Sequence, residues 1–333
     1  MDQKPKGPSA VAVGEPVAGE KPSVGISSCL LGNEVRYNGG HKLDRYLRDT
    51  LGEHVRWVPV CPEVECGLGV PRESMRLVGD AESPRLLTVR SRVDHTTRMM
   101  EWAAGRLAAL EREELCGFVF KSGSPSSGLR AVRVYDDSGN PSRRGAGLFA
   151  RAFTQRFPAI PVEDDGRLND NALRESFVER VFVFWRWRRL LRQGGELDAL
   201  VSFHTEHKLL IMAHSAAAVS VLGRIVAHAK GRPWVEVCAD YLRELTRALA
   251  LQATVKKNVN VLQHVMGYFK KDISAGDKAE LQEVIGQYHR GLIPLVVPIV
   301  LLRHHARRLG EPYLARQLYL DPFPAELMLR NHV

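Results

Sequence analysis

The chain has 333 residues, of which 44% are hydrophobic and 26% charged, with a formal net charge of +9 and five cysteines. This length is about twice that of a usual domain and indicates two domains. No stretch approaches the roughly 20 uninterrupted apolar residues of a membrane span, which argues against a membrane protein. An odd cysteine count without a secretory signal argues against a disulfide framework and favours a reducing, cytoplasmic location.

The first half of the chain predicts a disordered tail followed by an α/β domain. Residues 1–22 mix proline, glycine and charge without an apolar run, so we expect a disordered tail rather than a signal peptide. Short apolar runs then alternate with helical periodicity over residues 23–165. The predicted strands are 24–28, 57–60, 117–121 and, as a possible fourth, 132–135; the predicted helices are 41–51 and 94–112. This alternation is typical of a doubly wound, Rossmann-like α/β sheet.

Three cysteines lie at the ends of the first two predicted strands. Cys29 closes the first strand, and Cys61 and Cys66 follow the second. The carboxyl ends of parallel strands converge on one crevice, where three thiolates could share a metal centre that leaves one position for water or substrate. The alternative is that these cysteines are small buried apolar side chains, which is our interpretation of Cys116 and Cys238.

The third predicted strand runs into a loop of hydroxyl groups. Residues 121–128 read Lys-Ser-Gly-Ser-Pro-Ser-Ser-Gly. A simple turn is the alternative, but proline and glycine would suffice for a turn, and four serines beside a lysine exceed that need. We therefore favour a functional loop, at the same sheet edge as the cysteines.

The second half, after a polar linker at 163–169, predicts an all-α helical domain over residues 170–333. The predicted helices are 177–192, 198–215, 216–229, 234–251, 255–270, 278–289 and 292–309. Residues 171–333 hold 23 lysines and arginines against 15 aspartates and glutamates, so this half carries +8 of the total +9. Such an excess indicates an acidic partner such as nucleic acid, although solvated helix faces give similar counts.

Several predicted helices interleave basic and aromatic residues, which neutralise phosphates and stack on bases in nucleic-acid-binding proteins. Some of these aromatics must instead belong to the core. In the helix at 198–215, histidines recur on one broad face, but their spacing is not the HExxH of zinc enzymes, so a phosphate-facing stripe is the better interpretation. The predicted RNA-binding residues are Arg186, Arg188, Arg189, His204, His207, Lys208, Lys256, Lys257, Lys270 and Lys271.

Several separated blocks resemble known bacterial proteins. Residues 29–32 (CLLG), 35–40 (VRYNGG), 61–63 (CPE), 66–68 (CGL) and the loop 121–128 resemble the signatures of the thiouracil desulfurases. In the helical half, residues 203–208, 213–215, 260–262, 267–269 and 329–331 resemble the domain fused to them in tRNA 4-thiouridine desulfidases. Together the resemblance covers residues 24–333.

This resemblance implies a [4Fe-4S] cluster held by Cys29, Cys61 and Cys66, with one iron free to take the sulfur of a thiocarbonyl. Thiocarbonyl plus water gives carbonyl plus hydrosulfide, with no net redox change. Glu63 is expected to activate water or pass protons, or alternatively only to bind a nearby backbone group. Ser122 and Ser124 are the further predicted catalytic residues. The predicted substrate-binding residues are Arg36, Tyr37, Lys121 and Ser126.

The expected function is therefore desulfuration of 4-thiouridine in tRNA to uridine by a cytoplasmic enzyme. Two alternatives stay open. The first is desulfuration of a free thiolated base such as thiouracil. The second is a non-enzymatic iron–sulfur sensor that binds nucleic acid, although a sensor needs neither an open iron nor Glu63.

Overall fold

The computed structural model describes residues 20–136 and 138–332, so residues 1–19 of the predicted tail lie outside it. The described chain forms two compact units. The sheet unit comprises Lys21–Trp185 and Phe323–His332, and the helical unit comprises Arg186–Pro322 with Glu20. The units therefore divide inside helix α4 (Asn171–Arg192), later than the change in composition at 163–169. Whether 23–165 and 170–333 behave as separate domains stays a prediction.

The sheet unit is built on a four-stranded parallel sheet with strand order β2-β1-β5-β8. Its strands are β1 (Ser23–Ser27), β2 (Arg56–Val60), β5 (Gly117–Phe120) and β8 (Val162–Asp164). The first three confirm the predicted strands. The predicted linker is wrong at its start, because Glu163 and Asp164 are buried in β8 beside β5. The Glu163 carboxylate accepts a hydrogen bond from Arg167 at 2.8 Å, whereas burial raises the pKa of Asp164, which is bound by the Leu129 amide.

A second sheet, with order β4-β3-β6-β7, extends the same unit. Its strands are β3 (Met75–Val78), β4 (Arg85–Thr88), β6 (Val132–Tyr135) and β7 (Pro141–Gly145). The strand predicted at 132–135 is confirmed, but it belongs to this second sheet and not to the doubly wound one. Side chains of β3, β4 and β6 form a small apolar core under helix α2.

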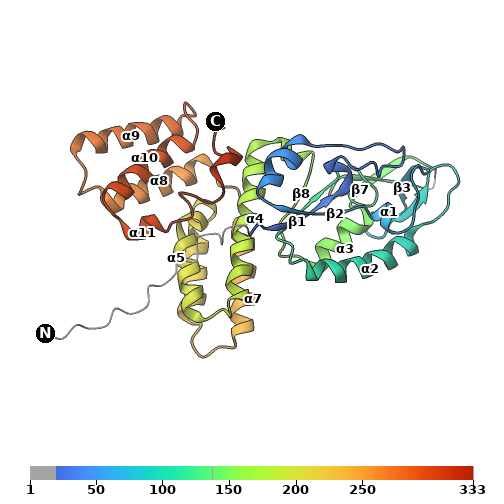
Figure 1. The fold of residues 1–333 in the computed structure, drawn as a ribbon, viewed down its shortest axis with the longest axis horizontal. Coiled ribbons are helices and arrows are strands. Elements are labelled where there is room, and N and C mark those ends of the chain that lie inside the picture. Colours follow the sequence, from blue (N-terminus) through green and yellow to red (C-terminus); the bar gives the residue numbers. More distant parts are fainter. Residues whose placement is uncertain (1–19, 137, 333) are drawn as a thin grey trace. The chain divides into compact units, whose positions relative to one another are not determined.

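Helices cover both faces of the parallel sheet. Helices α2 (Thr96–Arg112) and α3 (Leu148–Arg156) pack side by side (Figure 1), and two phenylalanines of α3 lie against Phe118 and Phe120 of β5. On the other face, Gly117 lets α4 approach closely, since a Cβ there would lie 2.7 Å from Val181. The fold is therefore the predicted α/β arrangement. The helix predicted at 41–51 is shorter, a π-helix η2 (Tyr46–Thr50) followed by a 3-10 turn η3 (Leu51–Glu53).

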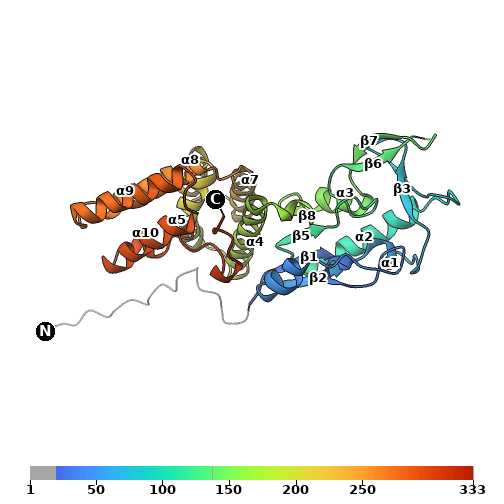
Figure 2. The same cartoon turned by 90° about the horizontal axis from the view of Figure 1, so that it is seen from above.

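The helical unit confirms the predicted series of helices. They are α5 (Leu197–His214), α6 (Ala216–Ala227), α7 (Trp234–Leu249), α8 (Val255–Phe269), α9 (Ala275–His289), α10 (Val296–Arg308) and the short α11 (Pro312–Ala315). Trp187, Phe203 and Tyr241 form an aromatic core, and α8, α9 and α10 pack on one another (Figures 1 and 2). Within the described ranges no helix has the length and apolar character that crossing a membrane requires.

Candidate functional site

The loops that follow β1, β2 and β5 surround one pocket of about 270 Å³. The parallel register aligns Ser27 of β1 with Val60 of β2, so the residues after both strands emerge at the same edge. The loop after β5 emerges beside them at this edge, because β5 pairs with β1 on the side opposite β2. The predicted convergence of the three loops is thus confirmed.

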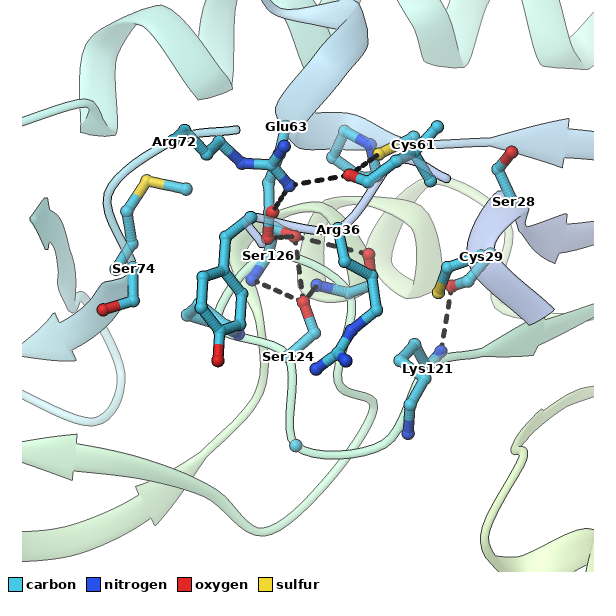
Figure 3. A pocket seen from close by; sticks show the side chains of 18 of the residues that line it. Ser28, Cys29, Arg36, Cys61, Glu63, Arg72, Ser74, Lys121, Ser124 and Ser126 are labelled. Carbon is cyan, nitrogen blue, oxygen red and sulfur yellow. Dashed lines mark hydrogen bonds and ion pairs between the residues drawn. The ribbon is translucent and has the colours of Figure 1, made fainter. Parts of the chain in front are cut away.

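Two of the predicted cysteines line this pocket. Cys29 lies in the 3-10 turn η1 (Ser28–Leu31), and Cys61 precedes helix α1 (Pro62–Glu65) (Figure 3). Burial, with a further contribution from the nearby Cys61, raises the pKa of the Cys29 thiol to about 11. Burial also raises the pKa of Cys61. Both thiols are therefore protonated at neutral pH, and a metal that binds them must displace protons.

Cys66 is not in the pocket, so the expectation that three thiols meet there is wrong. Its sulfur lies 3.3 Å from the carbonyl oxygen of Glu63, inside the apolar core with Leu77, Leu86 and Met99. The reason is geometric. Cys66 follows Cys61 by five residues around helix α1, and because a helical turn contains 3.6 residues, the two side chains point in different directions. Among the described residues, no group of three or more His, Cys, Asp or Glu side chains is arranged to hold a metal ion.

Glu63 is bound by two side chains. It pairs with Arg72, and its Oε1 accepts a hydrogen bond from Ser126 Oγ at 2.9 Å (Figure 3). The Glu63 and Arg72 side chains are only 15% and 8% exposed. Arg72 also donates to the carbonyl of Val35 at 3.0 Å. The role of binding a nearby backbone amide falls instead to Glu65, whose Oε1 accepts from the Cys61 amide at 2.8 Å.

Arg72 is the main residue of this pocket that sequence reasoning missed. It lies in an irregular loop with no periodic pattern, and its partner is nine positions away. The one signal that could have led to Arg72 is the need of Glu63, if it is buried, for a cation as partner.

The serine loop is held firmly at the pocket edge. Ser124 Oγ accepts hydrogen bonds from the amides of Ser126 at 3.3 Å and Ser127 at 3.2 Å. The Ser126 carbonyl accepts from the Phe149 amide at 2.9 Å, at the start of α3. Gly147 permits this contact, since a Cβ there would lie 2.5 Å from the Ser126 carbonyl. The loop is therefore a packed element rather than a free turn.

Lys121 and Ser122 line the pocket but are engaged with each other and with Asp165. Lys121 Nζ lies 3.0 Å from an Asp165 oxygen and donates to Ser122 Oγ at 2.9 Å. Roles of Lys121 in substrate binding and of Ser122 in catalysis stay predictions. On the opposite loop, Arg36 and the exposed Tyr37 line the pocket as expected of substrate-binding residues, with the guanidinium 5.5 Å from the ring centroid.

Three of the predicted RNA-binding residues are buried within the helical unit, so the surface role predicted for them is wrong. Arg186 donates to the carbonyl of Pro322 at 2.6 Å, Arg189 is paired with Glu20 at 3.7 Å, and His207 is 0% exposed against Phe203. These three side chains lie on buried faces of α4 and α5 and contact groups of the same unit rather than solvent.

The other predicted RNA-binding residues divide into two groups. Lys257 donates to the carbonyl of His214 at 2.7 Å at the end of α5, and His204 is hydrogen-bonded to Tyr241 at 3.0 Å. Arg188 is half-buried. The exposed members are Lys208, Lys256, Lys270 and Lys271.

Sequence reasoning also missed a basic hollow on α10, although the run RHHARR at 303–308 signals it. Its lining residues are Val300, Arg303, His304, Arg307 and Arg308. Arg303 and Arg308 are paired with Asp321 and Asp277, respectively. Arg307 is exposed, which makes it a candidate contact for an anion.

Comparisons with known proteins separate the same two parts of the chain. Residues 24–165 match the model of the 2-thiouracil desulfurase family, and residues 208–324 match that of a protein family of unknown function, DUF1722. The uncharacterized protein YbgA of Escherichia coli K12 is 29% identical over 160 residues, which are 47% of this chain and 94% of YbgA. A solved structure, the [4Fe-4S]-dependent thiouracil desulfidase TudS, is 29% identical over 47% of this chain and 99% of its own, with a TM-score of 0.38.

A second curated relative is the uncharacterized protein YbbK of Bacillus subtilis 168. It is 34% identical over 150 residues, which are 44% of this chain and 97% of YbbK. The segment matched by the desulfurase model contains both pocket cysteines, Glu63 and the serine loop. Through residues 24–165, the chain belongs to the 2-thiouracil desulfurase family.

Proposed function

We propose that this protein is an iron–sulfur desulfidase that converts 4-thiouridine in tRNA to uridine and releases hydrosulfide. The observation that carries the proposal is the pocket, in which two thiols, a carboxylate and several hydroxyls meet at the carboxyl edge of a parallel sheet inside the segment that matches the desulfurases. Ligands of open α/β sheets bind at this edge.

The cofactor that we propose is a [4Fe-4S] cluster, as in the desulfidase TudS. Cys29 and Cys61 fit it, because both lie in the pocket and thiolates are the usual ligands of such clusters. Cys66 does not fit without leaving the apolar core. When bound, the cluster would supply a Lewis-acidic iron with affinity for soft sulfur.

The protein's own contribution to the reaction is proton transfer and positioning. Replacing the thiocarbonyl sulfur with the oxygen of water requires both protons to leave that water, one of which ends on the sulfur as hydrosulfide and the other in solvent. We propose that Glu63, which is paired with Arg72, accepts the first proton. Ser126 Oγ bridges Glu63 to Ser124 Oγ, 3.1 Å further on, so the three side chains form a continuous path for protons. Arg36 and Tyr37 would contact the base.

The choice of tRNA rather than a free base rests on the helical unit. Its half of the chain carries the net positive charge, and lysines on α5 and α8 are exposed, as is Arg307 on α10. A thiolated base in folded RNA must be turned out of its stack at a cost of a few kcal/mol, which contacts with the flanking phosphates can offset.

The test uses full-length protein reconstituted anaerobically with iron and sulfide. It is given tRNA that contains 4-thiouridine and, separately, free 4-thiouracil, while hydrosulfide is measured. Mass spectrometry of the digested nucleosides should show 4-thiouridine replaced by uridine. Turnover of free thiouracil with unchanged tRNA would favour the small-molecule alternative, and no turnover of either substrate by cluster-loaded protein would favour the sensor.

A further inference from the structure

The outer face of the second sheet carries a row of arginines. Strand β6 turns its valines into the apolar core and Arg133 to the opposite, exposed face. The antiparallel strand β7 places Arg144, which is also exposed, directly opposite Arg133. On the other side of β6, strand β3 runs parallel with Leu77 aligned to Val134, so the preceding residue of β3, Arg76, lies beside Arg133. Three neighbouring strands (Figure 2) thus contribute one arginine each, and we call these three residues the arginine row.

The two exposed arginines face each other without an acidic partner. No ion pair joins Arg133 or Arg144 to an acidic side chain of residues 20–136 or 138–332. Asp136, in the turn between the two strands, accepts a hydrogen bond from the Asn140 amide at 2.8 Å. Like charges directly opposite each other on antiparallel strands destabilise the strand pair. A bound anion would remove this repulsion.

The third arginine of the row is held by packing. The Arg76 guanidinium lies 5.1 Å from the centroid of the Tyr135 ring. The turn after β6 also borders it, since a Cβ at Gly139 would lie 3.4 Å from a guanidinium nitrogen. Arg76 Nε has no hydrogen-bond partner among the described residues. The position of Arg76 is therefore fixed by a ring and a turn and does not depend on an acidic side chain.

The arginine row begins beside the pocket. Strand β3 starts at Met75, which lines the pocket, and Arg76 is the next residue. Strand β6 starts at Val132, which borders the end of the serine loop, since a Cβ at Gly128 would lie 2.4 Å from it. Because β3 and β6 are parallel, both strands start at the same end of the second sheet. A polynucleotide with one base in the pocket would therefore have its neighbouring phosphates close to this end.

The chemistry of the row fits a phosphate backbone. Neighbouring strands are about 4.8 Å apart, so three arginines on adjacent strands span roughly 10 Å. The guanidinium group binds phosphate through two parallel hydrogen bonds. Contacts of this kind position a nucleic acid without reading its bases. A free thiolated base has no phosphate and would leave the row unoccupied.

We infer that the arginine row binds the phosphates that flank the target nucleotide, so that the sheet unit itself contacts the RNA beside the pocket. This inference rests on the proposed function, since it takes the substrate to be an RNA. It adds a second contact surface to the exposed cations of the helical unit. The row would hold the part of the RNA next to the reacting base, and the helical unit would hold more distant parts.

The first experiment measures tRNA binding by the full-length, anaerobically reconstituted protein at several salt concentrations. Arg133→Gln and Arg144→Gln should each weaken binding of thiolated tRNA about 5- to 10-fold at 0.1 M salt and lower the slope of log K against log salt by about 1. Arg133→Lys keeps the charge and should keep the slope. The matched control is Arg112→Gln, an exposed arginine at the end of α2, near the start of β5 and so at the sheet edge opposite the pocket, which should bind as wild type does. Turnover of free 4-thiouracil should stay unchanged in all four variants.

The second experiment locates the contact by hydrogen exchange with mass spectrometry. Bound tRNA should slow exchange of the β6 and β7 amides in wild type and do so much less in the double variant Arg133→Gln with Arg144→Gln. Arg133→Glu provides a variant whose fold is favoured, because a glutamate opposite Arg144 forms an attractive cross-strand pair. Without RNA its β6 and β7 amides should exchange no faster than those of wild type, yet its tRNA affinity should fall further than that of Arg133→Gln.

Two results would overturn the inference. One is a double variant whose tRNA affinity and salt slope equal those of wild type. The other is wild-type protein in which bound tRNA leaves exchange of the β6 and β7 amides unchanged. In both cases wild type can still convert 4-thiouridine in tRNA, so the proposed function survives. Wild-type protein that consumes free 4-thiouracil but neither binds nor converts thiolated tRNA would instead refute both proposals together.

Discussion

The Glu63–Arg72 pair predicts a large effect from a single substitution. Arg72→Met keeps most of the side-chain volume but leaves the Glu63 carboxylate, 15% exposed, without its cation. Removing one partner of a buried pair costs about 3–5 kcal/mol. A matched pair lies on the same short helix, where Glu65 lies 3.1 Å from Arg106 and the two side chains are 32% and 23% exposed. The corresponding Arg106→Met substitution should cost only about 0–1 kcal/mol.

The measurement is hydrogen exchange by mass spectrometry at increasing urea concentration, which reports on the sheet unit separately from the helical unit. Peptides from β1, β2 and β5 should show a lower free energy of unfolding in Arg72→Met than in Arg106→Met, by about 2 kcal/mol or more. Equal losses in the two variants would refute the reasoning, since the burial of the first pair would then have no energetic consequence. Arg72→Lys should fall between wild type and Arg72→Met, because it restores the charge without the hydrogen bonds to backbone carbonyls.

Three further predictions concern catalysis, acid stability and RNA binding. Glu63→Gln should keep the cluster and lower turnover about 10²-fold in the hydrosulfide assay. The control variant Glu65→Gln should turn over at the normal rate. A normal rate for Glu63→Gln would mean that Glu63 has only a structural role. Burial lowers the pKa of His207 to about 3 and that of His204 to about 4, so stability should be constant above pH 6.5 and fall as the pH drops toward these values. At pH 5 each histidine should cost the helical unit about 2 kcal/mol relative to pH 7.5, and His207→Gln should remove its share in urea unfolding at the two pH values. The logarithm of the tRNA association constant should fall with the logarithm of salt concentration with a slope of roughly −3 to −6, and Lys270→Ala with Lys271→Ala should reduce that slope by about 1 per lysine; a slope near zero would contradict binding through phosphates.

The sequence predicts those parts of the fold that depend on local patterns. Strands β1, β2 and β5 are short apolar runs, and helices α5 to α10 repeat apolar residues at helical spacing, so each can be recognised without knowing its neighbours. Strand β8 could not be recognised in this way, because two of its three residues are acidic. Their burial depends on Arg167 and on the Leu129 amide, which binds Asp164 from a distant part of the chain.

The difference between local patterns and distant partners also explains which predictions of site residues were right and which were wrong. Cys29 and Cys61 follow parallel strands directly, so strand topology alone brings them together. The direction of Cys66 depends on the turn of α1 and on an apolar core built from the second sheet, which the sequence did not reveal. Arg186 looks like a surface residue in its basic run, yet its hydrogen-bond partner, the Pro322 carbonyl, lies 136 positions away. Partners at such separations leave no signal in a single sequence.

If the substrate is an RNA, as proposed, the volume of the pocket implies that most contacts with it lie outside the pocket. At about 270 Å³ the pocket lies just below the range of roughly 300–1,000 Å³ typical of sites that enclose small ligands, so it can hold a base but not a nucleotide with its neighbours. The ribose and phosphates of a polynucleotide would therefore remain outside and gain little from Glu63 or the serine loop. If the substrate is tRNA, as proposed, affinity for the rest of the RNA has to come from exposed cations outside the pocket, and we propose the lysines of α5 and α8 and Arg307 of α10 for this role. Substitutions of those cations should thus raise KM for tRNA and leave kcat, and the turnover of a free base, unchanged.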